Sequence, residues 1–132
     1  MRVLVDSNIL ISAALNAKGT PYKAFLKAVT YPNKGVICSQ NLEELRKIFY
    51  KKFPNKIGLL EQFLSIALLA MEVIPIPCDA MDEESLVRDK ADRPILRAAI
   101  AENVDVIITG DKDFLESGIR KPKIMTASEF LN

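Results

Sequence analysis

The chain of 132 residues has the length of one domain, and about half of its residues are hydrophobic, enough for one continuous core. The charge is nearly balanced, with 18 basic against 17 acidic residues, so net charge alone indicates neither a nucleic-acid nor a membrane partner. Histidine is absent, which excludes serine–histidine triads, imidazole metal sites and acid–base catalysis by histidine.

The first part of the chain alternates short β-rich segments with helical patterns. A strand is typically marked by β-branched residues, and a helix start by a capping residue followed by proline. The expected elements are a buried strand at 3–5, a buried helix at 9–17, a helix opened by Thr20-Pro21, a strand at 35–38, and a helix that Ser39 can cap and Pro54 ends.

The same alternation continues to the end of the chain. The expected elements are a helix at 57–71, a strand at 73–76, an acidic connection at 77–91, a helix at 93–103, a strand at 104–109, a short helix beginning at Phe114, a strand at 124–125, and a last turn opened by the capping-box residues Thr126 and Glu129. Pro75 indicates that strand 73–76 is an edge strand.

This order predicts a single α/β domain over residues 1–132. We expect a parallel sheet of four or five strands with helices on both faces, because successive strand–helix–strand units form parallel sheets. The strands at 3–5 and 104–109 should be central.

The cysteine pattern and the absence of long apolar segments predict a soluble, cytoplasmic protein without membrane association. Cys38 and Cys78 lie far apart, which is typical of reduced thiols. The first five residues meet Asp6 too soon for a signal-peptide core. The apolar segment 63–71 is far shorter than the roughly 20 residues of a membrane span.

Acidic residues follow the predicted strands where these strands leave the sheet. Asp6 follows the first strand, Asp111 and Asp113 follow strand 104–109, and Asp89 and Asp92 precede the helix at 93. Ligands bind at the carboxyl ends of strands in open α/β sheets, so these acids should share one rim. Carboxylates gathered there repel one another unless a cation holds them, and oxygen ligands without histidine suit Mg²⁺ or Mn²⁺.

Each of these acids also has a plain structural explanation. Asp6 and Asp92 could cap the helices that follow them. Asp111 and Asp113 could be turn formers. The number of acids at one predicted rim favours the metal site over this set of separate explanations.

Two polar residues beside the acids are candidates for a supporting role. Asn8 could be a turn residue or could orient a neighbouring carboxylate. Thr109 could be an ordinary strand residue or could support the acids that follow it.

Helical geometry separates two adjacent glutamates in the helix after the second strand. Its apolar residues Leu42, Leu45, Ile48 and Phe49 span one arc of the helical wheel. Glu44 lies about 40° beyond this arc. Glu43 points away and pairs with Lys47 at i+4. Glu44 is therefore the better candidate for the rim, the alternative being an ordinary border acid.

Basic residues gather around Tyr50 in and just after the same helix. Lys51, Lys52 and Lys56 are candidate phosphate contacts for nucleic acid, together with Arg46 and Lys47. The alternative is a solvated helix face.

Four segments together resemble PIN domains. These are Val-Leu-Val-Asp-Ser-Asn-Ile-Leu-Ile-Ser at 3–12, Leu-Glu-Glu-Leu at 42–45, Asp-Arg-Pro-Ile-Leu-Arg-Ala-Ala at 92–99 and Ile-Ile-Thr-Gly-Asp-Lys-Asp-Phe-Leu at 107–115. The chain is most similar to the PIN proteins of toxin–antitoxin systems. Ser7 stands where threonine is frequent in the family, which keeps a hydroxyl at this position.

The resemblance implies a metal-dependent ribonuclease with a five-stranded parallel sheet, frequent homodimers and often a small antitoxin partner. The implied catalytic and metal-binding carboxylates are those of Asp6, Glu44, Asp92 and Asp111, with Asp113 as a further acid. Asn8 is implied to support Asp6.

Two other functions are open at this point. A phosphatase of the haloacid dehalogenase type also places an aspartate after its first strand, but it needs a second acid where this chain has Asn8. A PIN module that binds RNA or a partner protein without cleaving RNA is the non-enzymatic alternative. Metal-dependent turnover would distinguish this module from a nuclease.

Overall fold

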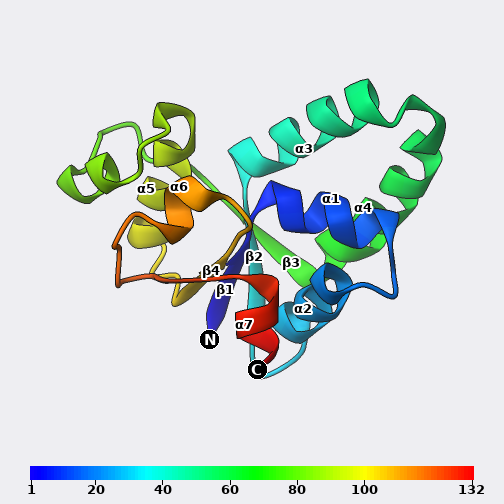
Figure 1. Ribbon diagram of the computed structural model, residues 1–132, viewed down its shortest axis with the longest axis horizontal. Helices are drawn as coiled ribbons and strands as arrows, with labels where there is room; N and C mark the ends of the chain where they lie inside the picture. The colour runs from blue at the N-terminus through cyan, green and yellow to red at the C-terminus, as the bar shows by residue number, and fades with distance from the viewer.

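The computed structural model describes residues 1–132 and contains one five-stranded parallel sheet (Figure 1). The strand order is β3-β2-β1-β4-β5, and every adjacent pair is parallel. The strands are β1 (Arg2–Val5), β2 (Lys34–Cys38), β3 (Met71–Ile74), β4 (Val106–Ile108) and β5 (Lys123–Met125). The predicted sheet is confirmed, with β1 at its centre and β4 beside it.

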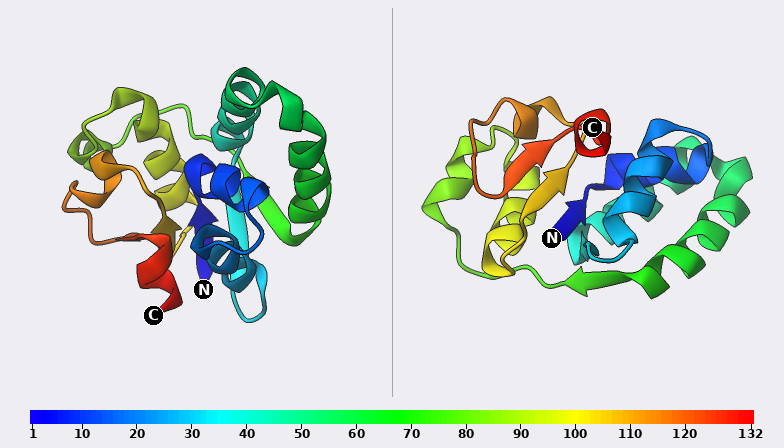
Figure 2. Two further views of the ribbon diagram at one scale, coloured as in Figure 1. Left: turned by 45° about the vertical axis from the view of Figure 1, so that its right-hand side comes forward. Right: turned by 90° about the horizontal axis from the view of Figure 1, so that it is seen from below.

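Helices cover both faces of the sheet, as predicted (Figure 2). One face carries α1 (Ser7–Leu15), α2 (Thr20–Val29), α3 (Ser39–Lys52), α4 (Ile57–Ala70) and α7 (Ala127–Leu131). The other carries α5 (Arg93–Ala101) and α6 (Lys112–Leu115). Three short 3-10 helices, η1 (Pro54–Lys56), η2 (Asp82–Leu86) and η3 (Lys90–Asp92), lie in the connections.

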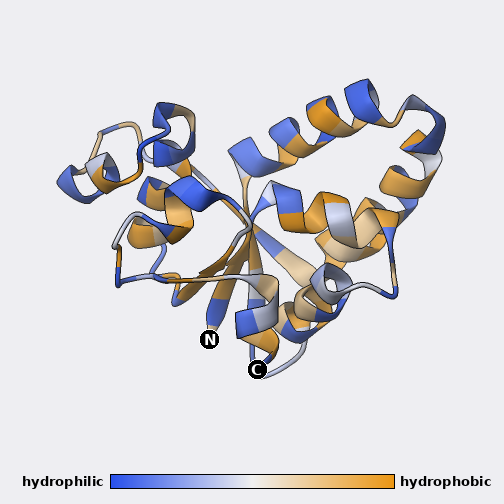
Figure 3. Ribbon diagram, viewed as in Figure 1, coloured by the Kyte–Doolittle hydropathy of each residue, from blue (hydrophilic) through white to orange (hydrophobic).

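The alternation of side chains along the strands divides the interior into two cores. Val3 and Val5 face the larger core, whereas Leu4 between them faces the smaller one. Phe49 in the larger core and Phe114 in the smaller core are the largest fully buried side chains. Figure 3 shows hydrophobic strands at the centre and polar residues on the outer surfaces of the helices.

Several element boundaries differ from the sequence prediction. Helix α1 spans Ser7–Leu15, because Asp6 accepts a hydrogen bond from the Ser7 N–H and starts the helix earlier than expected. Gly19, and not Thr20, occupies the N-cap position of α2. Strand β3 spans Met71–Ile74, so Pro75 lies beyond this edge strand.

Further differences concern the ends of α3, β4 and α6. Cys38 takes the N-cap position of α3 without a side-chain bond, so Ser39 is the first helical residue. Strand β4 contains only 106–108 of the predicted 104–109. Phe114 lies near the end of α6 because Asp111 caps this helix at Lys112. The capping box of Thr126 and Glu129 is present as predicted.

A buried ion pair anchors the long connection between β3 and α5. The guanidinium of Arg97 donates to both carboxylate oxygens of Glu84, at 2.8 and 2.9 Å, and to the carbonyl of Pro77 at 2.9 Å. These bonds lower the pKa of Glu84. The connection is therefore tied to α5 both before η2, at Pro77, and within η2, at Glu84, which fixes the approach to Asp89 and Asp92.

The helices are too short or too polar to cross a lipid bilayer.

We expect Phe114→Ala to lower the free energy of unfolding by about 3–5 kcal/mol, because it removes a fully buried ring and leaves a cavity. Urea unfolding followed by circular dichroism measures this change. Leu69→Ala, at a leucine with 87% exposure, is the matched control and should change the free energy by no more than about 0.5 kcal/mol. Equal losses in the two variants would contradict the assignment of Phe114 to the core.

Candidate active site at the carboxyl edge of the sheet

Asp6 is the buried centre of the acidic rim. It follows the central strand β1 and is only 4% exposed. One carboxylate oxygen accepts bonds from the Ser7 N–H and the Asn41 side-chain amide, both at 2.9 Å. The other accepts from the Thr109 hydroxyl at 2.8 Å. Asp6 does cap α1, but its remaining bonds reach two other segments of the chain.

Thr109 connects the acids of two neighbouring strands. Its hydroxyl donates to Asp6 and accepts from the backbone N–H of Asp111 at 3.0 Å. Asn8 contacts the same loop, since its side-chain oxygen accepts from the Gly110 N–H at 3.2 Å. Asn8 thus contacts the loop that carries Asp111, and its observed hydrogen bond is to this loop and not to Asp6.

Asn41 is a site residue that the sequence analysis missed. It is fully buried in the first turn of α3 and binds Asp6 directly. Its position is four residues before Leu45, so it lies on the inward face of the helix. A polar amide at an inward helical position was the available signal.

Asp92 lies at the start of α5 and is 8% exposed. Its side chain does not cap the helix, and its Oδ2 atom has no hydrogen-bond partner. Carboxylate oxygens of Asp89, Asp92 and Asp113 lie within 4.8 Å of one another. The sequence placed Asp89 on the rim but did not include it among the candidate ligands. It caps η3 by accepting from the Ala91 N–H at 3.0 Å.

Asp111 and Asp113 come from the loop and helix after β4. Asp111 caps α6 by accepting from the Asp113 N–H at 2.9 Å. The Asp113 carboxylate pairs with Arg88 at 2.9 Å, and the same guanidinium contacts Glu116 at 3.0 Å. Asp113 thus lies at the outer, more exposed side of the rim.

The two adjacent glutamates occupy different environments. Glu44 is half-buried, and burial raises its pKa, as do the charges of Asp6, Asp89 and Asp111. Glu43 is exposed. Glu44 therefore shares the electrostatic field of the rim.

Burial and mutual repulsion disfavour the charged forms of the inner acids. Burial raises the pKa of Asp6, and the charge of Asp111 raises it further, whereas the hydrogen bond from Thr109 lowers it. Burial, followed by the contact with Asp111, raises the pKa of Asp92 to about 8. Such carboxylates are stabilised in the ionised form by a cation.

The donor atoms of the rim are suited to a hard divalent cation. The Oδ1 atom of Asn41 and the Oδ2 atom of Asp92 are buried without partners, and all the candidate ligands are oxygens. Oxygen-only sites are typical of Mg²⁺ and Mn²⁺. Helices α1, α3 and α5 begin at this rim, and their positive N-terminal dipole ends stabilise the ionised carboxylates.

The basic residues of α3 and η1 lie apart from the acids. Lys51 and Lys52 are in the last turn of α3, and Lys56 ends η1. Lys52 follows Glu44 by about two helical turns, or about 12 Å along the helix. The structure therefore places these lysines at the far end of α3.

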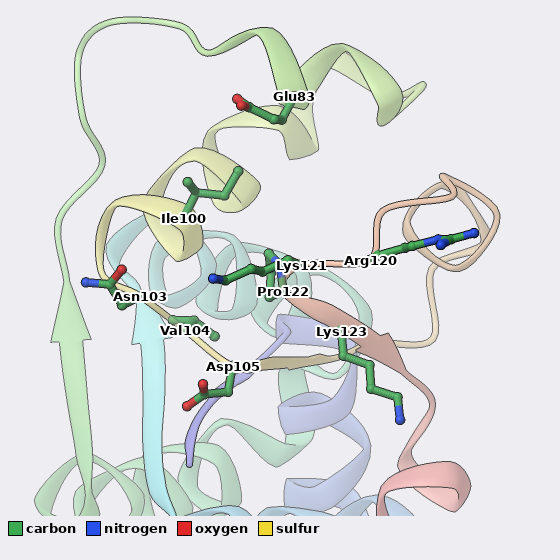
Figure 4. Close-up of a pocket in the computed structure, with 9 residues that line it drawn as sticks. All are labelled: Glu83, Ile100, Asn103, Val104, Asp105, Arg120, Lys121, Pro122 and Lys123. Atoms are coloured by element: carbon green, nitrogen blue, oxygen red, sulfur yellow. The ribbon is translucent and has the colours of Figure 1, made fainter.

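The largest cavity, about 490 Å³, lies at the opposite end of the sheet. Figure 4 shows that the cationic ends of Arg120, Lys121 and Lys123 point in different directions around it. Glu83 and Asp105 place opposite charges in the same lining. None of the rim carboxylates reaches this cavity, so it is not the candidate active site.

Comparisons with known sequences identify a family and a related protein. The family model described as PIN domain matches residues 2–113. An uncharacterized protein of Methanocaldococcus jannaschii is 26% identical over 120 residues, which cover 87% of this chain and 74% of that protein.

Three solved structures share the fold. VapBC2 from Rickettsia felis, bound to a promoter DNA fragment, has a TM-score of 0.71 at 22% identity and covers 96% of this chain and 98% of that chain. VapC20 of Mycobacterium tuberculosis, a sarcin–ricin loop-cleaving toxin, has a TM-score of 0.63 at 15% identity. The match covers 89% of this chain and 95% of that chain. PAE2754 from Pyrobaculum aerophilum has a TM-score of 0.67 at 18% identity, and the match covers 99% of this chain and 88% of that chain.

The family match extends from the first strand to the acids after β4, and so includes every element that forms the acidic rim. On this evidence, the chain belongs to the PIN-domain family.

Proposed function

We propose that this chain is a nuclease that hydrolyses RNA phosphodiesters with Mg²⁺ or Mn²⁺. The observation that carries the proposal is the acidic rim, in which the buried Asp92 keeps an unpartnered oxygen beside other carboxylates. Asp6, Glu44, Asp92 and Asp111 are the proposed metal-binding residues, and Asp113 is a further acid at the outer side. Membership in the PIN family supports the nuclease activity.

The protein's residues would prepare the site before the substrate arrives. Thr109 and Asn41 hold the Asp6 carboxylate in one orientation, and Thr109 also fixes the backbone of Asp111. The Oδ2 atom of Asp92 is free to accept a proton or to bind a cation. A bound divalent ion supplies Lewis-acid stabilisation of charge on the phosphodiester. With no histidine in the chain, the carboxylates are the bases available at neutral pH.

We also propose that the chain is the toxin of a toxin–antitoxin pair, with a small antitoxin protein as partner, and that it acts in the cytoplasm as a homodimer. The likeness of its fold to VapBC2 and VapC20 supports this biological role. Light scattering of the purified chain, alone and with the product of a neighbouring small gene, tests the dimer and the partner.

Two alternatives separate clearly from this proposal. The phosphatase is disfavoured because Asn8 holds Gly110 where that chemistry needs an acid, and because the family model is a PIN domain. A non-catalytic PIN module would bind metal or RNA without turnover. Incubation of the purified protein with mixed RNAs in Mg²⁺, Mn²⁺ or EDTA distinguishes it from the nuclease.

We expect Asp6→Asn, Asp92→Asn and Asp111→Asn each to abolish metal-dependent RNA cleavage while the variants stay folded. Each change removes an anionic oxygen ligand but relieves repulsion in the metal-free rim. Manganese should raise the melting temperature of the wild type by mass action and that of the variants much less. Asp82→Asn, at an exposed aspartate in η2, is the matched control and should behave as the wild type. Cleavage that is equally fast in EDTA would refute the metal-dependent mechanism.

The adjacent glutamates provide a second test within one helix. Glu44→Gln should reduce metal affinity and cleavage by about tenfold or more. Mutation of residues that only support a metal ligand already causes losses of this size. Glu43→Gln should change little, because an exposed i,i+4 pair contributes only about 0.3–0.5 kcal/mol. Isothermal titration with Mn²⁺ and a cleavage assay measure both effects. The reverse ranking would assign the ligand to Glu43.

The raised pKa of Asp92 predicts how the stability of the metal-free protein depends on pH. Between about pH 4, the ordinary pKa of aspartate, and pH 8, the folded protein holds a proton at Asp92 that the unfolded chain has lost. The stabilising contribution of Asp92 is therefore complete below about pH 4. As the pH rises from 4 towards 8, the free energy of unfolding should fall by up to about 1.4 kcal/mol per pH unit.

Urea unfolding in EDTA at pH 5, 6, 7 and 8 measures this dependence. Asp92→Asn should flatten the decline, and Asp82→Asn should retain it. A decline that is identical in wild type and Asp92→Asn would show that another group titrates.

A further inference from the structure

The long connection between β3 and α5 brings one basic side chain directly onto the acidic rim. Arg88 lies between η2 and η3, and its Nη2 atom is 2.9 Å from the carboxylate of Asp113 and 3.0 Å from that of Glu116. The other ion pairs of the protein join residues outside the rim. Arg88 is therefore the only basic residue that is paired with an acid of the rim.

The backbone is anchored on both sides of Arg88. Val87 is fully buried in the smaller core, and its carbonyl accepts a hydrogen bond from Arg93 at 2.9 Å. Asp89, on the other side, caps η3. The position of Arg88 at the rim is therefore set by the fold, and a side chain that is already positioned loses less entropy when it binds a ligand.

Most of the hydrogen-bonding capacity of this guanidinium is unused. Arginine has five N–H donors in a planar fork, and both ion pairs of Arg88 use the Nη2 atom. The Nε and Nη1 atoms form no hydrogen bond with the rest of the protein, and the side chain is 67% exposed. Three donors are therefore available to a ligand. Two neighbouring donors of this fork match two oxygens of one phosphate.

The surroundings of Arg88 select the kind of anion that it can meet. Carboxylate oxygens of Asp113, its partner, and of Asp89 and Asp92 lie within 4.8 Å of one another. These acids repel an anion unless a cation is bound among them. An anion at Arg88 therefore also has to suit a hard divalent cation close by. A phosphodiester meets both requirements, because its oxygens bind such cations and accept hydrogen bonds from arginine.

We propose that Arg88 binds a non-bridging phosphate oxygen of the RNA substrate at the rim through its free Nε and Nη1 donors. In this arrangement Asp113 and Glu116 hold the guanidinium by one nitrogen and leave the other two for the substrate. The fixed positive charge stabilises the negative charge that develops on the phosphate oxygens during cleavage. The inference rests on the proposed nuclease function and adds a phosphate-binding residue to it.

The alternative is that Arg88 only ties the connection to α6. In that case the loss of either partner of an ion pair should have the same effect on the site. If Arg88 binds phosphate, removal of the arginine weakens RNA binding. Removal of the charge of Glu116 does not weaken it, because this change takes a negative charge away from the path of the RNA.

Four variants separate these roles. Arg88→Gln removes the charge and the fork, Arg88→Lys keeps the charge alone, and Glu116→Gln removes one anchor. Arg120→Gln is the matched control, since it makes the same charge change at an exposed arginine at the opposite end of the sheet. Binding of a fluorescently labelled 12-nucleotide 2′-O-methyl RNA is measured by anisotropy in Mg²⁺ at one salt concentration, and gel electrophoresis verifies that the RNA stays intact.

Arg88→Gln should weaken RNA binding about tenfold or more, the loss expected for a charge-assisted hydrogen bond. Arg88→Lys should recover only part of this loss, because an ammonium keeps the charge but not the fork. Glu116→Gln should bind RNA at least as tightly as the wild type. Arg120→Gln should stay within about twofold of the wild type. Circular dichroism verifies the fold of each variant.

Titration calorimetry with Mn²⁺ adds a measurement that does not involve RNA. Arg88→Gln should bind Mn²⁺ as tightly as the wild type or up to about fivefold more tightly, because it removes a competing cation from Asp113 and an exposed ion pair is weak. Weaker binding of Mn²⁺ by Arg88→Gln would show that Arg88 shapes the rim itself and would overturn the proposal.

The outcomes distinguish the phosphate contact from the nuclease proposal. Equal RNA binding by the wild type and Arg88→Gln, or equal weakening by Arg88→Gln and Arg120→Gln, would overturn the phosphate contact. Equal weakening by Arg88→Gln and Glu116→Gln would leave Arg88 with a structural role alone. If the wild type still cleaves RNA with metal, these results leave the nuclease standing. The predicted binding pattern without any metal-dependent cleavage by the wild type would overturn the nuclease and support the phosphate contact.

Discussion

The burial of the Asp6 carboxylate is the constraint on which the candidate active site depends. A buried carboxylate is costly unless its oxygens accept hydrogen bonds. Here the donors come from three separate places: the first turn of α1, the first turn of α3 and the end of β4. Satisfying this one charge therefore fixes the relative positions of the segments that carry Glu44 and Asp111.

The hydrogen bonds of Asp6 do not remove the repulsion within the rim. Asp92 adds a second buried carboxyl, and its raised pKa reflects the energy that an additional charge would cost there. The two cores on either side of the sheet contain none of these acids, so their apolar packing can stabilise the fold and offset the repulsion within the rim. A cation bound there would offset this repulsion.

The long connection after β3 is as important to the site as the strands themselves. It delivers Asp89 and Asp92 to the rim from the smaller core side, whereas Asp6 and Glu44 belong to segments that pack on the larger core side. The clamp between Arg97 and Glu84 ties this connection to α5. The rim is thus assembled at the boundary between the two cores.

The sequence by itself determined the class of the fold and most of the acidic set. Alternating strand and helix patterns require a parallel sheet, and a parallel sheet brings the residues after its strands to one edge. This reasoning placed Asp6, Asp92 and Asp111 at one edge, and a helical wheel separated Glu44 from Glu43. Element ends were less predictable, since caps such as Asp111 decide them through local bonds that a hydrophobic pattern does not contain.

Only the tertiary structure decided which side chains meet across the rim. Asn41 looks like an ordinary helix residue, and it binds Asp6 because β1 and β2 are neighbours, a fact of strand order. Asn8 turns to Gly110, which lies in the loop after β4. These contacts join residues that are distant in the chain. Periodicity reports the face on which a residue lies, whereas its partner on that face is set by the packing of separate elements.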